Sequence, residues 1–255
     1  MGQSMWSRFS AAGMSGPTLA ALGLLLVVAA CVLARAYANG ARTRRSPFGN
    51  ALALLCIVTS THAGAVAFSS GLLAQVGYRW GMEAPVRVLE WRARLAVFRA
   101  ADHRELLAQV NAYWNRMPYA DDPAHWLAAD YWATPVEMLG SNGGDCEDYV
   151  FGKYFTLREL GLPPERLRMV YVAVAGWPEG HMVLAYYPTP NADPWILDNL
   201  TEEILPASHR ADLQPIYSFN DDDVWEAGSQ LRTGSAQQVR AWRALVEKMA
   251  RERRL

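Results

Sequence analysis

One cysteine, Cys146, stands where a glycine-rich turn meets the start of a helix. Residues 141–149 read SNGGDCEDY, and the two glycines allow a sharp turn that places Cys146 in the first helical turn. The partial positive charge of a helix N-terminus favours a thiolate over a thiol. The pattern therefore predicts a cysteine nucleophile. The alternative is an inert buried thiol, which is common for unpaired cysteines.

A thiolate nucleophile needs a general base, and the base needs an acceptor that orients it. His181 opens the alternating run HMVLAYY, and Asp198 lies in the next such run, WILDNL. If the two runs are antiparallel neighbours, both side chains can lie on the face toward the cysteine helix, with Val183 and Ala185 on the same face as His181. This predicts a triad of Cys146, His181 and Asp198. On spacing alone, a structural histidine and a turn-capping Asp198 are the alternatives.

Three carboxylates, those of Asp145, Glu147 and Asp148, flank the cysteine. Their negative charge raises the pKa of a nearby thiol and opposes the effect of the helix. They either complement the helix N-terminus or form an oxygen-rich site for Ca²⁺, which takes roughly six to eight such ligands and would cancel the charge penalty. The segment lacks the register of an EF-hand loop. Without a second cysteine or a nearby histidine, zinc is disfavoured.

The charges are distributed unevenly along the 255 residues. Residues 1–79 hold six arginines and no lysine, aspartate or glutamate, whereas residues 80–255 hold 18 basic and 25 acidic residues, a balance of −7. Binding to nucleic acid requires a basic surface. We therefore expect no nucleic-acid partner.

Two long runs near the N-terminus contain no lysine, arginine, aspartate or glutamate. They cover residues 9–34 and 46–78, which is 26 and 33 residues. The first is long enough to cross a hydrocarbon layer of about 30 Å. Both runs could span the membrane with the arginine-rich loop inside, as the positive-inside rule requires. The alternative without export is that the second run is a buried core helix.

Cleavable signals would explain the same residues. A signal peptide could begin near the arginine cluster and be cut near Ala63 or Ala65, or a lipoprotein-type site could precede Cys31. Each targeting interpretation delivers residues 66–255 across a membrane, and we assign residues 1–65 to signal or membrane-spanning segments. In an oxidising compartment the single cysteine of the body cannot form an internal disulfide, which favours a reactive thiol.

The elements that must position these residues can be read from hydrophobic periodicity. We expect helices over 86–100, from the N-cap Asp102 to Trp114, over 146–160 and over 236–254, and strands over 168–175, 181–187 and 195–200. In the first helix, Val88, Leu89, Leu95 and Phe98 are the expected buried positions. Residues 119–144 are expected to form an ordered loop, and the segment around His209 a solvated surface. The order of elements predicts an α+β domain in which the cysteine helix packs on an antiparallel sheet.

The motifs together resemble one family, the bacterial transglutaminase-like cysteine proteinases of the LapG type. The resemblance covers roughly residues 84–226. It rests on DYWATP (130–135), GDCEDY (144–149), GKYF (152–155), GHMVLAYY (180–187), LDNL (197–200), LPAS (205–208) and YSFN (217–220). It implies a papain-like, transglutaminase-like fold in which Cys146, His181 and Asp198 match the triad. Asp145 and Glu147 match the family's calcium ligands, and Asp148 stands beside them.

The resemblance also implies a biological role. Members of the family are periplasmic, calcium-dependent proteases that cleave a large repeat-containing surface adhesin near its N-terminus, at an Ala-Ala site, and so release the cell from its biofilm. An inner-membrane receptor for cyclic diguanylate holds the protease inactive when that messenger is abundant. Residues 1–79 depart from the family's single signal peptide, which leaves a membrane-tethered form or an early start codon open.

Within such a site, the backbone N–H of Cys146 is the expected oxyanion donor, with a second donor near Trp132. Three alternative functions remain: a transglutaminase-like acyltransferase or amidase with the same triad, a non-catalytic binding module, and a membrane-anchored regulatory module.

Overall fold

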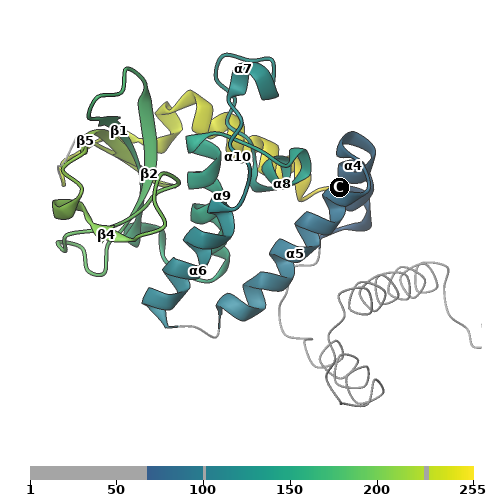
Figure 1. Cartoon of the computed structure of the whole chain (residues 1–255), viewed down its shortest axis with the longest axis horizontal. Helices are drawn as coiled ribbons and strands as arrows, with labels where there is room; N and C mark the ends of the chain where they lie inside the picture. The colour runs from purple at the N-terminus through teal and green to yellow at the C-terminus, as the bar shows by residue number, and fades with distance from the viewer. Residues whose placement is uncertain (1–67, 100–101, 227–229) are drawn as a thin grey trace, which may run out of the picture. The chain divides into compact units, whose positions relative to one another are not determined.

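The computed structural model describes residues 68–99, 102–226 and 230–255 (Figure 1). The expected targeting segments, residues 1–65, and their boundary with the body lie outside these residues. Within the described ranges, no helix has both the length and the apolar composition needed to cross a membrane. The helices are α4 (Ser70–Trp80), α5 (Glu83–Phe98), α6 (His103–Asn115), α7 (Asp122–His125), α8 (Pro135–Ser141), α9 (Cys146–Glu159) and α10 (Arg240–Glu252).

The strands form one antiparallel sheet in the order β4-β3-β2-β1-β5-β6-β7. They are β1 (Leu167–Val174), β2 (Gly180–Tyr186), β3 (Trp195–Leu197), β4 (Leu205–Pro206), β5 (Leu213–Phe219), β6 (Asp223–Glu226) and β7 (Arg232–Ser235). The three predicted strands are therefore confirmed as neighbours, in the register that pairs Val172 with His181 and Leu184 with Leu197. The third strand is shorter than expected and ends just before Asp198.

The helix α9 packs between the sheet and the remaining helices, as Figure 1 shows. Met182, Leu184 and Leu197 lie on the helix side of the sheet and share one core with residues of α5, α6 and α9. Val183 and Ala185 belong to a second cluster on the other side. The prediction that their face is the one toward the cysteine helix is therefore wrong, because the opposite parity supplies the large side chains that fill the space beneath α9.

A buried threonine, Thr156, joins α9 to two other helices. Its hydroxyl oxygen accepts hydrogen bonds from the indole nitrogens of Trp91 on α5 and Trp114 on α6, both at 2.9 Å. The hydroxyl itself donates to the carbonyl of Gly152 at 2.6 Å. A Cβ at Gly152 would lie 2.5 Å from the ring of Trp114, so only glycine admits this close approach. These contacts fix the helix that carries Cys146.

The helix predictions hold with local corrections. Asp102 caps α6 by accepting from the N–H of Glu105 at 2.9 Å, as expected. In α5, Leu89 is 39% exposed, and the buried position there is Trp91 instead, one turn from Val88 and Leu95. The expected loop over 119–144 contains the short helices α7 and α8.

The helix α8 begins with a capping box. The Thr134 hydroxyl accepts from the N–H of Glu137, and the Glu137 carboxylate accepts from the N–H of Thr134. This reciprocal arrangement satisfies two backbone donors that a helix start leaves free.

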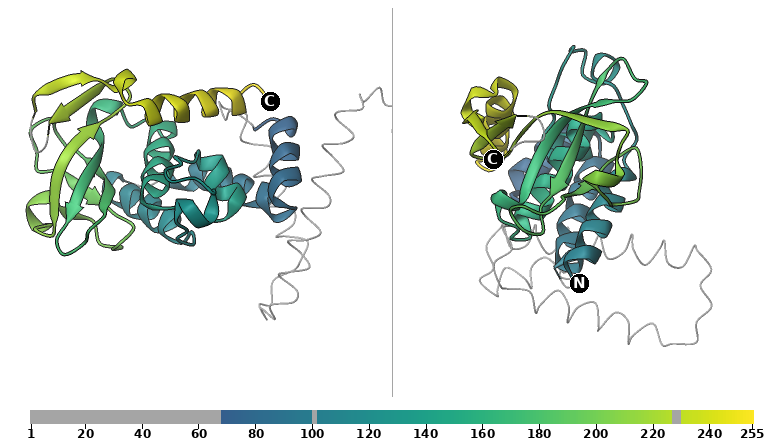
Figure 2. Two further views of the ribbon diagram at one scale, coloured as in Figure 1. Left: turned by 90° about the horizontal axis from the view of Figure 1, so that it is seen from above. Right: turned by 90° about the vertical axis from the view of Figure 1, so that its left-hand side faces the viewer.

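The C-terminal helix α10 runs from the sheet toward α4 (Figure 2). Its Lys248 ammonium donates to the carbonyl of Trp132 and pairs with Glu137 at 2.9 Å. The Thr134 hydroxyl donates to Glu252 of the same helix. The segment that precedes the cysteine helix is thus held by residues more than a hundred positions later.

Candidate active site

Cys146 is the first residue of α9, as the sequence predicts. The turn before it differs from expectation, because the left-handed residue is Asn142, at φ 62°, and not a glycine. Gly144 is required for a different reason: a Cβ there would lie 2.5 Å from a carboxylate oxygen of Asp148. The glycine therefore lets the acidic side chain fold back under the turn.

The sulfur of Cys146 lies between a carboxylate and the start of β2. It is 2.7 Å from Oε2 of Glu147, to which the thiol donates. The backbone N–H of Met182, the residue after His181, donates to the sulfur. Burial raises the pKa of the Cys146 thiol, and the negative charges of Glu147 and Asp145 raise it further, while the N–H of Met182 lowers it. In this arrangement the proton stays on sulfur.

His181 and Asp198 form a buried pair. Nε2 of His181 is 2.8 Å from Oδ1 of Asp198, and the two residues are 2% and 0% exposed. Burial alone would raise the pKa of Asp198, but hydrogen bonds from His181 and from the N–H of Leu200 outweigh it and lower the pKa to about 2. With Nε2 facing the carboxylate, Nδ1 is the ring nitrogen left to accept a proton from a thiol. The structure thus brings all three predicted residues to the start of β2.

The sequence did not predict two buried basic residues near Asp198, which are Arg210 and Lys153. Arg210 follows the exposed His209, yet its guanidinium contacts Oδ2 of Asp198 at 2.8 Å. Lys153, on α9, is fully buried, and its Nζ has no hydrogen-bond partner in the part of the chain that is described. Burial lowers the pKa of Lys153 to about 7, although the charge of Asp198 opposes this shift. An arginine two residues before an aspartate is typical of a surface pair, so no sequence signal marked Arg210 as buried.

Three carboxylates converge behind the cysteine turn: those of Asp122, Asp145 and Asp148. One oxygen from each lies within 4.8 Å of the others. Asp122 comes from α7 and was not among the predicted ligands. The predicted ligand Glu147 lies at the edge of this group, where it is hydrogen-bonded to Asp145 as well as to Cys146. Its role as a ligand stays a prediction.

The chemistry of this acidic cluster fits a hard cation. Asp122, Asp145 and Asp148 each have one buried oxygen without a hydrogen-bond partner among the described residues. Burial, followed by the charges of Glu147 and Asp148, raises the pKa of Asp145 to about 9, and burial holds that of Asp148 well above its usual range. Carboxyls that crowd together in this way without a cation must keep their protons. Ca²⁺ prefers such oxygen ligands.

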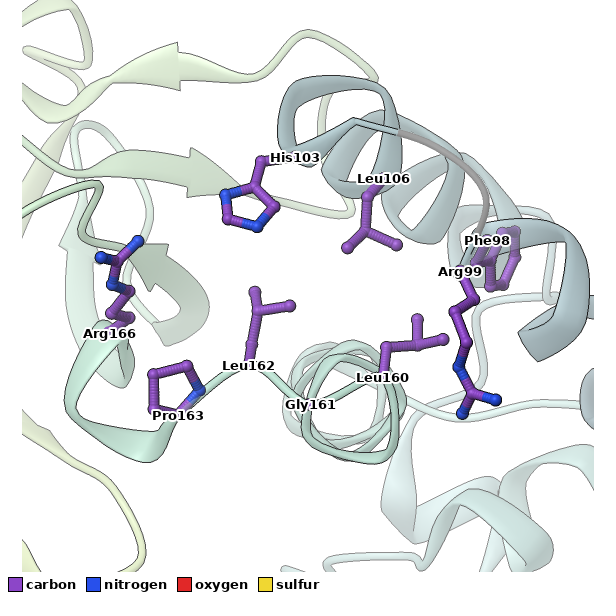
Figure 3. A pocket seen from close by; sticks show the side chains of 9 residues that line it. All are labelled: Phe98, Arg99, His103, Leu106, Leu160, Gly161, Leu162, Pro163 and Arg166. Carbon is purple, nitrogen blue, oxygen red and sulfur yellow. The ribbon is translucent and has the colours of Figure 1, made fainter. Parts of the chain in front are cut away.

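A cavity of about 430 Å³ lies at the other end of α9 (Figure 3). Residues at the end of α5, at the start of α6 and just after α9 line it, including His103 and Leu160. A helix of this length places it about 20 Å from Cys146. It is therefore separate from the predicted site.

A cysteine at a helix start, next to the first residues of an interior strand that carries a buried histidine–carboxylate pair, is the arrangement of a transglutaminase-like cysteine protease. The family model of the bacterial transglutaminase-like cysteine proteinases matches residues 90–226. The chain belongs to this family. A comparison with curated proteins finds no match.

Solved structures of LapG from Legionella pneumophila are similar over most of the domain. The EGTA-treated form is 34% identical, with a TM-score of 0.63, and the match covers 73% of this chain and 100% of LapG. The calcium-bound form is 36% identical, with a TM-score of 0.61, over 69% and 97% of the two chains. A third LapG structure is 34% identical, with a TM-score of 0.61, over 72% and 98%.

Proposed function

We propose that this protease is a calcium-dependent cysteine endopeptidase of the periplasm. Its substrate would be the N-terminal region of a large repeat-containing surface adhesin, whose cleavage frees the cell from a biofilm. Its inhibitory partner would be the periplasmic domain of an inner-membrane receptor for cyclic diguanylate. The observation that carries the catalytic part is the buried 2.8 Å bond between His181 and Asp198 beside Cys146. The substrate, partner and compartment rest on the resemblance to the LapG type.

The catalytic sequence follows from these three side chains. Nδ1 of His181 takes the thiol proton, and the thiolate attacks the scissile carbonyl to form a carbon–sulfur bond. The imidazolium then protonates the leaving amine as the peptide bond breaks, and water releases the acyl group from sulfur. Asp198 holds the ring so that Nδ1 faces the reaction. The N–H of Cys146 is the proposed oxyanion donor, and a second donor near Trp132 stays a prediction.

The acidic cluster supports the calcium dependence, as does the calcium-bound form of the similar LapG. Asp122, Asp145 and Asp148 would hold the ion, with Glu147 as a further ligand. A bound Ca²⁺ would supply positive charge that lets these carboxyls ionise. The hydrogen bond from the thiol to Glu147 keeps Cys146 protonated, so any interaction that engages Glu147 elsewhere favours the thiolate.

A cleavage assay tests the proposal. The full-length chain is incubated with an adhesin N-terminal fragment that contains an Ala-Ala site, with Ca²⁺ or with excess chelator. We expect cleavage only with Ca²⁺, and none with C146A or H181A. Replacement of the exposed His209 by alanine is the matched control and should leave the rate unchanged.

The products separate the proposal from its rivals. Mass spectrometry should show two peptides whose summed masses equal that of the substrate plus one water, without cross-linked species. Cross-linked products would identify an acyltransferase, and turnover by C146A would exclude the cysteine mechanism. N-terminal sequencing of the protein from fractionated cells tests its export. Pull-down with the receptor domain, with and without cyclic diguanylate, tests the partner.

A further inference from the structure

Arg210 is a buried arginine for which the catalytic sequence has no role. It follows the short 3-10 helix η2 (Ala207–His209) and is only 7% exposed. Its Nη2 is 2.8 Å from Oδ2 of Asp198, a residue with no exposed surface. A charge buried this deeply needs a partner of opposite charge, and for Arg210 this partner is Asp198 of the predicted triad.

The two oxygens of Asp198 have separate partners. Oδ1 accepts from Nε2 of His181 at 2.8 Å and from the N–H of Leu200 at 3.0 Å. Oδ2 accepts from Arg210. The backbone on this side is fixed as well, because the amide of Asn115 donates to the carbonyl of Asp198 at 2.8 Å. Without Arg210, Oδ2 would be buried without this charged donor, and the carboxylate would turn toward other donors.

Arg210 is itself held from the solvent side. Its Nε and Nη2 donate to the carboxylate of Asp212 at 2.9 and 2.8 Å, and the Asp212 side chain is 46% exposed. A planar guanidinium that is fixed along one edge presents its remaining N–H in a defined direction. The chain of contacts therefore runs from the surface through Arg210 to Asp198 and His181.

We propose that Arg210 is a positioning residue, whose guanidinium holds the Asp198 carboxylate in the orientation that presents Oδ1 to His181. This inference rests on the proposed function, because it assigns the arginine a role in the same triad. Among the described residues, the other titratable side chains near the pair are those of Lys153 and Cys146 from α9. Neither makes a hydrogen bond to Asp198, so Arg210 is the cation that fixes the carboxylate directly.

The orientation can be tested without turnover. In the full-length C146A protein, labelled with ¹⁵N-histidine, the neutral His181 ring should carry its proton on Nε2, as the bond to Asp198 requires. Substitution R210Q should mix the two tautomers, because the carboxylate is no longer fixed. The resonance is assigned by its loss in H181Q. An unchanged Nε2–H tautomer in R210Q would overturn the proposal even if the enzyme cleaved no known substrate.

Kinetics on the active enzyme give a second measurement. R210Q should lower kcat by about 10–100-fold and change KM by less than about 2-fold, because substrate binding is untouched. R210K keeps the charge but loses the planar fork, so it should restore part of kcat. In a D198N background, R210Q should cost no more than about 2-fold further, because Arg210 acts through Asp198. An equal loss in both backgrounds would contradict the inference.

A matched control removes an arginine from another ion pair. Arg158 pairs with Asp221 at 3.2 Å and donates to the carbonyl of Leu162. R158Q should lower thermal stability and leave the His181 tautomer and kcat unchanged. If R210Q does not fold, D212N loosens Arg210 from the exposed side and should shift the tautomer in the same direction, by less. A D212N protein with the wild-type tautomer would then decide against positioning.

Discussion

Replacing Thr156 by valine would remove a hydroxyl that three groups share and leave the shape of the side chain almost unchanged. The indole N–H groups of Trp91 and Trp114 would both lose their acceptor in a fully buried position. Each unsatisfied buried donor costs about 1–3 kcal/mol. We therefore expect T156V to lower the free energy of unfolding by about 2–6 kcal/mol, a large share of the stability of a domain of this size.

Urea or guanidinium unfolding of the full-length chain, followed by far-UV circular dichroism, measures this loss. T156S keeps the hydroxyl and removes one methyl group, so it should cost only about 1 kcal/mol. The exposed Thr233 makes one long hydrogen bond, at 3.4 Å. T233V should therefore fall within about 0.5 kcal/mol of the wild-type free energy of unfolding. A loss below about 1 kcal/mol for T156V would show that water or a rearranged indole satisfies both donors, and it would refute the reasoning.

Three further outcomes follow from the site. Removal of Ca²⁺ by a chelator should abolish cleavage reversibly, and D122N and D145N should each weaken Ca²⁺ binding in calorimetric titration; unchanged affinity in both would exclude the acidic cluster as the ion site. The pKa of Asp198 is lowered from 3.8 to about 2 in the folded state. Its contribution of about 2 kcal/mol should therefore be complete above about pH 5 and be lost as the pH falls toward about 2. D198N should flatten this part of the stability–pH curve, and an identical curve would contradict the assignment. At Gly180, an added Cβ would collide with the hydroxyl of Tyr171, so G180A should cost about 1–3 kcal/mol in thermal or denaturant unfolding.

The elements that hold the three predicted catalytic residues could be predicted because each has a strong local signal. The helix over Cys146–Glu159, the strand that carries His181 and the strand that ends just before Asp198 show clear periodicity, and their ends lie within three residues of the expected ones. The pairing of His181 with Asp198 needed only neighbouring antiparallel strands. The face of the sheet that meets α9 could not be predicted, because both parities of β2 are apolar and only their volumes distinguish them.

Residues that act through tertiary contacts gave no such signal. Asp122 lies in a four-residue helix inside an expected loop. Its carboxylate can be recognised as a candidate metal ligand only when the fold places it beside Asp145 and Asp148. Arg210 stands in a polar segment and is buried by the loop geometry around Asp198. The strands β5 and β7 were missed because most of their side chains are exposed or half-buried, so the apolar alternation is weak.

The contacts of α10 have a consequence for the order in which the chain can assemble. Lys248 and Glu252 hold residues 132–137, and the N–H of Ala133 in that segment donates to Asp148 at 2.7 Å. Synthesis proceeds from the N-terminus, so Cys146, His181 and Asp198 are all present before α10 exists. The segment under the acidic cluster cannot gain its last supports until residue 252 has emerged. A chain still being synthesised therefore carries all three predicted residues on a turn that lacks its contacts with α10, and these contacts form only when the final helix is complete.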